Sequence, residues 1–313
     1  MRAVTISDGQ LVVTERTDPR PSAGEVLVRV RAAGLNGADL HQLRGRYPAP
    51  AGVPADIPGL ELAGEVVERG PAAHRFAVGD AVMGILGGGG QAELAVAHER
   101  VLMTVPPLLS WAEAGGTAEV FTTAHDALFT QAGLVAGERL LVHGAAGGVG
   151  TAAVQIARAA GARVTATVRN PRLRDQVQAL GAEVVAPEGF DEHGPFDVVL
   201  ELVGAPNLAQ DLEAIDLNGR IVVIGIGAGA TTEINLARLL NKRGRLMAST
   251  LRSRPLEQKA LTARAVERSV LPALASGQVT VPVAETFDLA QAPAAYERFA
   301  AGGKLGKIVL TTD

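Results

Sequence analysis

The stretch that decides the fold is RLLVHGAAGGVGTAAVQIARAAGARVTATVRN, residues 139–170. It predicts a strand, a glycine-rich turn, a helix and a second strand, the unit that binds a dinucleotide at a helix N-terminus. Ala145 replaces the first glycine of the strict GxGxxG pattern, so AxGxxG remains. Gly147 would let the backbone approach a pyrophosphate, and Gly150 would let the helix pack close to the strand. The alternative is a tight turn with no ligand.

The residues of the turn that we expect to bind the coenzyme are Gly144, Ala145, Ala146, Gly147, Gly148 and Val149. About 20 residues further on, such units normally carry an acidic residue for the ribose hydroxyls. Here the second strand runs into Arg169, Asn170, Pro171 and Arg172. A 2′-phosphate carries about two negative charges and suits guanidinium groups. We therefore expect NADP(H) rather than NAD(H), bound by Arg169 and Arg172. The alternative, a solvated basic helix start, suits Arg172 better than Arg169.

Composition excludes several classes of function. The chain has 313 residues, of which 47% are hydrophobic and 20% charged, and its net charge of -4 gives no support for a nucleic-acid partner. It contains no cysteine, which removes disulfides, thiol catalysis and cysteine-ligated zinc. MRAVTISDGQ does not resemble a signal peptide, and no apolar run reaches the roughly 18 residues of a membrane span. We expect a cytoplasmic protein with no membrane partner.

Two patterns divide the chain. Residues 1–110 alternate apolar and polar residues in short runs separated by glycine and proline, which predicts a partly closed β domain that we end at residue 117. Residues 118–254 alternate strands with helices, which predicts a doubly wound parallel sheet of six strands. The tail, residues 255–313, opens with a long helix and returns to the first pattern, so we expect it to rejoin the N-terminal domain.

Several segments together resemble the medium-chain dehydrogenase/reductase superfamily: AAGLNGADLH, PGLELAGEVVERG, GDAVMG, HGAAGGVGTAAVQIARAAGA, LNGRIVVIG, LLNKRGRLMASTLRSR and LGKIVL. The chain is most similar to its zinc-free quinone oxidoreductase branch, the zeta-crystallin-like proteins, over essentially its whole length. The resemblance implies an α/β protein with a GroES-like partly closed β-barrel domain and a Rossmann domain. It also implies NADPH as coenzyme and a homodimer formed through the Rossmann sheet edge, at RGRLMAST.

The positions that carry catalytic zinc in the related alcohol dehydrogenases differ here. The resemblance places Asn36 where those enzymes have a cysteine and Leu60 where they have a histidine. Leucine cannot ligate a metal, and asparagine is a poor zinc ligand. Asp39, His41 and Glu61 remain, but no closed zinc set can be built from them, so we expect no metal. Without a Lewis acid, reduction of an electrophilic acceptor is more feasible than oxidation of an ordinary alcohol.

Two residues are candidates for catalysis. The resemblance places Asn36 beside the nicotinamide and the substrate, where its amide could orient the carboxamide or hydrogen-bond the acceptor oxygen. It could equally cap the helix that starts at GADLHQL. Tyr47 matches a family tyrosine that lines the quinone pocket, and its phenol could donate a proton to a developing enolate. The alternative for Tyr47 is an aromatic anchor of its loop.

Other residues are candidates for binding the coenzyme. Thr123 resembles a family threonine near the nicotinamide and its phosphates, with a helix N-cap as the alternative. Gly225 and Gly227 follow a central strand at its carboxyl end, where ligands of open α/β sheets bind. Thr250 and Leu251 end the next strand and could pack against the nicotinamide.

The sequence therefore predicts an NADPH-dependent reductase that transfers hydride to a small electrophilic acceptor, a quinone or an α,β-unsaturated carbonyl, without zinc. One alternative is an enoyl-thioester reductase of polyketide or fatty-acid type. A second is a non-catalytic, NADPH-bound binding or structural protein. A zinc-dependent dehydrogenase is the third.

Overall fold

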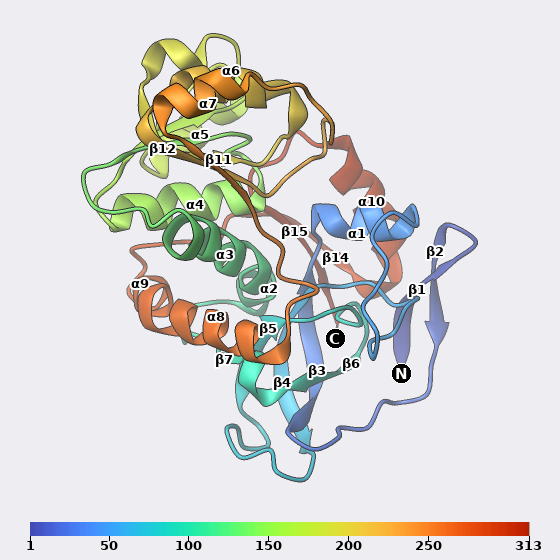
Figure 1. Cartoon of the computed structure of the whole chain (residues 1–313). Coiled ribbons are helices and arrows are strands. Elements are labelled where there is room, and N and C mark those ends of the chain that lie inside the picture. Colours follow the sequence, from blue (N-terminus) through green and yellow to red (C-terminus); the bar gives the residue numbers. More distant parts are fainter. Residues whose placement is uncertain (313) are drawn as a thin grey trace. The chain divides into compact units, whose positions relative to one another are not determined.

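The computed structural model describes residues 1–312, which form two compact units (Figure 1). The first unit contains residues 1–122 and 251–302 and the C-terminal residues from 307 onward. The second contains residues 123–250 and the short segment 303–306. The sequence had placed the two changes of domain at 117/118 and 254/255. None of the helices in residues 1–312 combines the length and the apolar character needed to span a membrane.

The first unit is built on a seven-stranded sheet whose order is β14-β15-β3-β4-β5-β7, with β6 paired to β3. Its strands are β3 (Glu25–Gly34), β4 (Glu61–Arg69), β5 (Ala81–Ile85), β6 (Leu94–His98), β7 (Leu102–Thr104), β14 (Val283–Asp288) and β15 (Lys307–Thr311). β1 (Arg2–Ser7) and β2 (Gln10–Glu15) form a separate hairpin. In β3, side chains alternate toward a core that includes Val26, Val28 and Val30. The predicted GroES-like fold is confirmed.

Helices surround this sheet. They are α1 (Gly37–Leu43), α2 (Trp111–Gly115), α8 (Leu256–Ser269), α9 (Leu271–Ala275) and α10 (Ala292–Ala301), with 3₁₀ turns η1 (Glu99–Val101) and η5 (Leu289–Gln291). α3 (Ala118–His125) contains the change from the first unit to the second. α2 begins with a capping box in which the Ser110 hydroxyl accepts from the N–H of Glu113.

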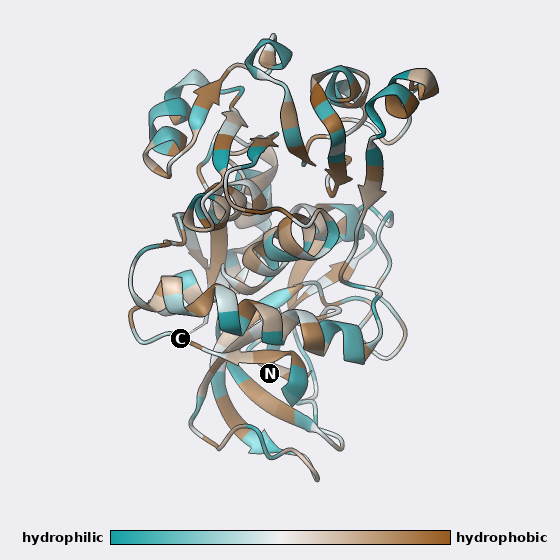
Figure 2. Ribbon diagram, turned by 60° about the vertical axis from the view of Figure 1, so that its left-hand side comes forward, coloured by the Kyte–Doolittle hydropathy of each residue, from teal (hydrophilic) through white to brown (hydrophobic). Residues whose placement is uncertain are grey.

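The second unit is a parallel sheet of six strands in the order β10-β9-β8-β11-β12-β13, which confirms the predicted Rossmann fold. The strands are β8 (Arg139–Val142), β9 (Arg163–Thr167), β10 (Glu183–Val185), β11 (Phe196–Glu201), β12 (Ile215–Val223) and β13 (Arg245–Ala248). The helices are α4 (Gly148–Ala159), α5 (Arg174–Ala179), α6 (Ala205–Ala214) and α7 (Leu236–Lys242), with a π-helix η2 (Asp126–Gln131) and the 3₁₀ turns η3 (Pro171–Leu173) and η4 (Phe190–His193). Figure 2 shows hydrophobic residues along the strands, as buried parallel strands require.

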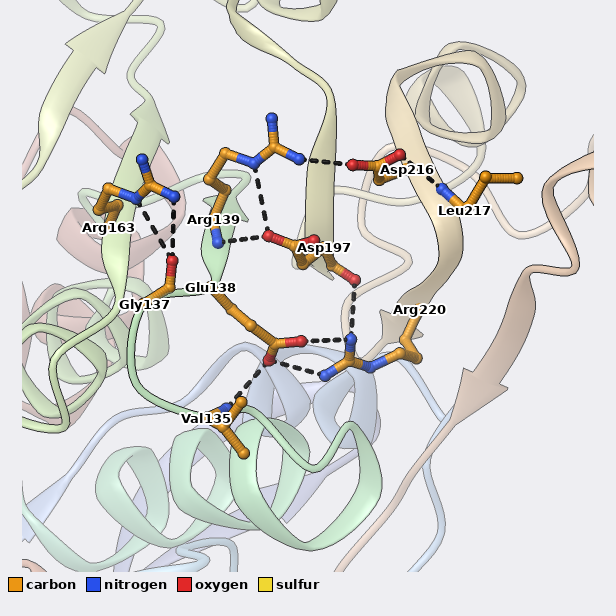
Figure 3. A network of polar contacts seen from close by, with 9 residues as sticks. All are labelled: Val135, Gly137, Glu138, Arg139, Arg163, Asp197, Asp216, Leu217 and Arg220. Carbon is orange, nitrogen blue, oxygen red and sulfur yellow. Dashed lines mark hydrogen bonds and ion pairs between the residues drawn. The ribbon is translucent and has the colours of Figure 1, made fainter.

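A charged network stabilises the amino ends of these parallel strands (Figure 3). Arg139 is the first residue of β8. Its backbone N–H donates to the carboxylate of Asp197 in β11, and its guanidinium donates to the carboxylate of Asp216 in β12. The two Nη atoms of Arg220 donate to the two carboxylate oxygens of Glu138, at 2.7 and 2.8 Å. The glycine turn and the candidate ligand site lie at the opposite, carboxyl ends of the strands, where ligands of open α/β sheets bind.

Candidate functional site

The glycine turn connects β8 to α4 and leaves the first N–H groups of α4 available. Gly144 has φ +63°, a left-handed conformation that favours glycine. Gly147 is the N-cap of α4, and a Cβ built on it would meet nothing closer than 3.5 Å. A Cβ on Gly150 would lie 2.6 Å from Cα of Ala145, so glycine at this position lets α4 pack closely against the turn that follows β8. The open face at Gly147 and the free N–H groups of the first helical turn fit a pyrophosphate.

Two arginines stand at the carboxyl end of β9, beside this turn. Arg169 and Arg172 are exposed, and neither guanidinium has a hydrogen bond or ion pair to any residue in 1–312. The Asn170 side chain instead accepts from the backbone N–H of Arg172, which starts the turn η3. Arg174 differs because its Nε donates to the carbonyl of Val168 at 3.2 Å. The two free guanidinium groups are the ones available to an anionic ligand.

A buried polar network lies directly beneath the turn. His143 Nδ1 is 3.0 Å from Oγ1 of Thr167, and His143 Nε2 is 2.8 Å from Oδ1 of Asp211. Burial raises the pKa of Asp211 to about 6, and the nearby carboxylate of Glu201 adds to this increase. The carbonyl of Thr167 accepts from the N–H of Ala145 at 3.2 Å. The network therefore connects the ends of β8 and β9 and fixes the conformation of the turn.

His143, Glu201 and Asp211 are also spaced for metal binding, with ligand atoms within 4.8 Å of one another. Their hydrogen bonds argue against that role. Oε1 of Glu201 accepts from the N–H groups of Val203 and Gly204, and its Oε2 accepts from Nδ2 of Asn207 at 3.0 Å. These contacts occupy the atoms that a metal would need, so we interpret the cluster as the support of the turn.

A second buried cluster lies in the first unit. Nζ of Lys307 donates to Oε1 of Glu61, to Oδ1 of Asn36 and to the carbonyl of Leu35, each at 2.7 Å. The other oxygen of Glu61 accepts from the N–H of Glu119 at 2.8 Å. The sequence had identified Asn36 and Glu61, but not Lys307.

Asn36 occupies the N-cap position of α1, as one of the two interpretations predicted, but its side chain points to the charged pair. Its amide nitrogen donates to Oε1 of Glu61 at 3.0 Å and to the carbonyl of Gly34 at 3.2 Å. Oδ2 of Asp39 accepts from the backbone N–H of Asn36, and burial raises the pKa of Asp39 to about 6. Both amide hydrogens of Asn36 are therefore already donated within the protein.

Tyr47 is half-buried in the irregular segment that follows α1. Its carbonyl accepts from Nη1 of Arg252 at 2.8 Å, and the Arg252 guanidinium lies 4.7 Å from the centre of its ring. The sequence showed Arg252 only as part of the TLRSR segment and gave it no role. Its spatial partners are far away along the chain, so no local pattern could have identified it.

The remaining predicted coenzyme residues fall in different settings. Thr123 lies inside α3, so the N-cap alternative was wrong. Gly225 allows a tight approach, since its Cβ would lie 2.1 Å from the carbonyl oxygen of Leu202, whereas Gly227 faces open space. Both glycines follow the carboxyl end of β12, as expected.

Thr250 ends residues 123–250 of the second unit, and Leu251 begins residues 251–302 of the first unit. The Leu251 side chain is buried beside a cavity of about 10 Å³, lined also by Met103 and Lys259. This cavity holds at most about one water molecule. The side chain of Leu251 therefore belongs to the core of the first unit.

Comparison with known proteins gives a consistent result. Residues 22–107 match a model described as alcohol dehydrogenase GroES-like domain, and residues 148–267 match one described as zinc-binding dehydrogenase. Human quinone oxidoreductase is 30% identical over 328 residues, covering 99% of this chain and 97% of the relative. The spectinabilin polyketide synthase system protein NorB of Streptomyces orinoci is 35% identical over 305 residues, but the chain spans only 13% of it. An alcohol dehydrogenase superfamily protein of Novosphingobium aromaticivorans, 31% identical, superposes with a TM-score of 0.89 over 100% of both chains.

Proposed function

We propose, from the premise that this chain belongs to the quinone oxidoreductase family within the medium-chain dehydrogenases/reductases, that it is a zinc-independent NADPH reductase. The family establishes an oxidoreductase that uses a nicotinamide coenzyme. Our proposal adds the choice of NADPH and the acceptor class, a quinone or an α,β-unsaturated carbonyl. When bound, the nicotinamide supplies the hydride to the acceptor.

One observation carries this proposal: Arg169 and Arg172 are free at the carboxyl end of β9. At this end of the second strand, an NAD(H) site requires a carboxylate for the ribose hydroxyls. A 2′-phosphate would instead be bound by guanidinium groups through charge-assisted hydrogen bonds. The N–H groups at the start of α4 would bind the pyrophosphate.

The donor set of the first unit supports zinc independence. Leu60 offers no ligand atom, and both oxygens of Glu61 are engaged by Lys307, Asn36 and a backbone N–H. The side-chain oxygen of Asn36 accepts from Lys307, and its amide group donates to Glu61 and to the carbonyl of Gly34. Asn36 is therefore poorly suited to donate to the acceptor oxygen. Tyr47 is the candidate proton donor.

A second function has its own support in the polyketide synthase relative, which is 35% identical. It would make this chain a reductase of enoyl thioesters. The same residues would act in both reactions, because an α,β-unsaturated thioester and a quinone both delocalise the negative charge that hydride transfer creates. The two functions differ in the acceptor rather than in the coenzyme.

We also propose a homodimer formed through the edge of the Rossmann sheet. β13 is an end strand of that sheet, and α7, which precedes it in the chain and packs on the neighbouring β12, has no buried residue. Leu236 and Leu240 of α7 are 68% and 74% exposed, and Leu246 of β13 is also exposed. An exposed edge strand with adjacent apolar side chains suits pairing with a second copy of this chain.

The decisive experiment follows NADPH oxidation by stopped flow against panels of quinones, enones and enoyl thioesters, with and without a chelator. Fast turnover of quinones or enones that survives chelation supports the proposal. Faster turnover of crotonyl thioester than of any quinone would favour the second function. Tight NADPH binding with no turnover would favour a binding protein, and activity lost to the chelator and restored by zinc would establish a zinc enzyme.

A further inference from the structure

Arg252 joins two segments of the first unit that are distant from it in sequence, residues 42–47 and the loop that contains Gly87. Its Nε donates to the carbonyl of Gly87 at 2.7 Å, Nη1 donates to the carbonyl of Tyr47 at 2.8 Å, and Nη2 donates to Oε1 of Gln42 at 2.7 Å. The side chain is 5% exposed, and no carboxylate in residues 1–312 forms an ion pair with it. Burial lowers the pKa of the guanidinium from its ordinary value.

A buried charge without a carboxylate partner is costly unless its hydrogen bonds are satisfied. Here three acceptors and the face of the Tyr47 ring replace the solvent. A neutral or apolar residue would avoid the cost of desolvation, so the retained charge points to a role beyond packing. That role is indicated by what the guanidinium touches, which is the segment that carries the proposed proton donor.

Two of these partners, Tyr47 and Gly87, lie in loops. Residues 44–60 connect α1 to β4 without regular structure, and residues 86–93 connect β5 to β6. The two loops are bonded to each other at one end, where the N–H of Gly89 donates to the carbonyl of Ile57 at 2.9 Å. Arg252 connects the two loops at a second point, because it donates hydrogen bonds to the carbonyls of both Tyr47 and Gly87. A loop held at two points loses much of the freedom that would otherwise displace its side chains.

We propose that Arg252 is the positioning residue for Tyr47: its planar fork holds both loops, and its charged face orients the phenol ring. This inference rests on the proposed function, because it assigns Tyr47 the role of proton donor. Lysine cannot replace the fork, since an ammonium group has neither its planar geometry nor its face for stacking.

The first test measures backbone hydrogen exchange in Arg252→Lys and Arg252→Gln, with Arg254→Lys as the matched control. Arg254 lies in the same segment, and its Nη1 donates to Oγ1 of Thr262 at 3.5 Å. We expect faster exchange in peptides covering residues 44–54 and 86–91 for both Arg252 variants, and unchanged exchange there in the control. Unchanged exchange in both Arg252 variants would overturn the proposal. This readout needs no activity, so it decides the question even if the wild-type protein reduces no acceptor, the result that defeats the proposed function.

The second test is a double-mutant cycle with Tyr47→Phe. We expect Arg252→Lys to lower kcat on the order of ten- to a hundredfold, as for other displaced active groups, with the Kd for NADPH unchanged. In the Tyr47→Phe background the same substitution should have little further effect, because the group it positions has already been removed. Equal losses in both backgrounds would overturn the assignment.

Discussion

Lys307 and Glu61 form an ion pair that is closed off from water: Nζ lies 2.7 Å from Oε1, and the residues are 2% and 0% exposed. The pair joins β15, the last strand, to the first residue of β4. Each charge is also hydrogen-bonded to other groups, including Asn36. Such complete satisfaction is what a buried ion pair needs to offset its desolvation.

Removing one member of this pair should be more damaging than removing both. Lys307→Met leaves the Glu61 carboxylate buried and unpaired, so the free energy of unfolding should fall by about 3–5 kcal/mol. The double variant Glu61→Gln, Lys307→Met should recover most of that loss. Urea unfolding gives both values.

The surface pair Arg31–Glu65 provides the control, since it joins the neighbouring strands β3 and β4 at 2.8 Å while about a third exposed. Arg31→Met should cost less than about 1 kcal/mol. A double variant at Glu61 and Lys307 that is as unstable as Lys307→Met alone would contradict this account.

Arg169→Ala should weaken binding of NADPH much more than binding of NADH. The lost charge-assisted hydrogen bonds to the 2′-phosphate correspond to a roughly ten- to hundredfold increase in the Kd for NADPH. Arg163→Ala is the control, because Arg163 begins the same strand at its other end and donates to the carbonyl of Gly137. Titration calorimetry with both coenzymes decides the matter. Equal losses for the two coenzymes in Arg169→Ala would refute the assignment.

An added methyl group should have different effects at two glycines of the turn: at Gly150 it should lower stability, and at Gly147 it should weaken coenzyme binding. Gly150→Ala places a Cβ 2.6 Å from the backbone of Ala145, so stability should fall by about 1–3 kcal/mol. Gly147→Ala meets nothing closer than 3.5 Å and has an ordinary φ of -74°, so its cost should be only that of alanine at a helix N-cap, about 1 kcal/mol or less. Its methyl group should instead obstruct the pyrophosphate and weaken NADPH binding. A stable Gly147→Ala protein with unchanged NADPH affinity would argue that the dinucleotide does not approach this face.

The sequence predicted the Rossmann unit in detail because its signals are local. The turn around Gly147 and the short apolar strands each lie within a few residues, and together they determine the order of elements. Arg169 became a candidate for the same reason, since it directly follows the predicted strand.

The buried partners could not be predicted in this way. Lys307 meets Glu61 only because β15 returns to the sheet of the first unit, and Arg252 meets Tyr47 across a similar separation. In the sequence, such residues look like any other charged residue near a strand or turn. Thr123 was considered a possible N-cap because the sequence does not show that the helix already begins at Ala118.

The raised pKa of Asp211 predicts how stability changes with pH. The folded protein keeps the proton up to about pH 6, whereas the unfolded chain loses it near the ordinary value of 3.8. The resulting stabilisation is complete below 3.8 and is lost as the pH rises through 6, a change of about 3 kcal/mol. Asp211→Asn removes the titration and keeps an oxygen for His143. Its free energy of unfolding, relative to wild type, should therefore rise between pH 4 and 6.5.

Glu188→Gln is the control for this measurement, because Glu188 is exposed and lies in the connection between β10 and η4, outside any helix. Its difference from wild type should stay constant over the same range in urea titrations at several pH values. A difference between Asp211→Asn and wild type that does not vary with pH would show that Asp211 is already ionised in the folded protein at pH 4.

The edge of the Rossmann sheet predicts the oligomeric state. If β13 pairs with its counterpart in a second copy, the exposed side chains of Leu240 and Leu246 become buried at the contact, and a charge there must be desolvated. Leu240→Glu and Leu246→Glu should therefore convert a dimer of 32.2 kDa chains into monomers, measured by light scattering after size-exclusion chromatography. Leu261→Glu, on α8 of the other unit and 67% exposed, should leave the dimer intact. A wild-type protein that is monomeric at micromolar concentration would contradict the proposed homodimer. A dimer that persists in both edge variants would show that the contact lies elsewhere on the protein.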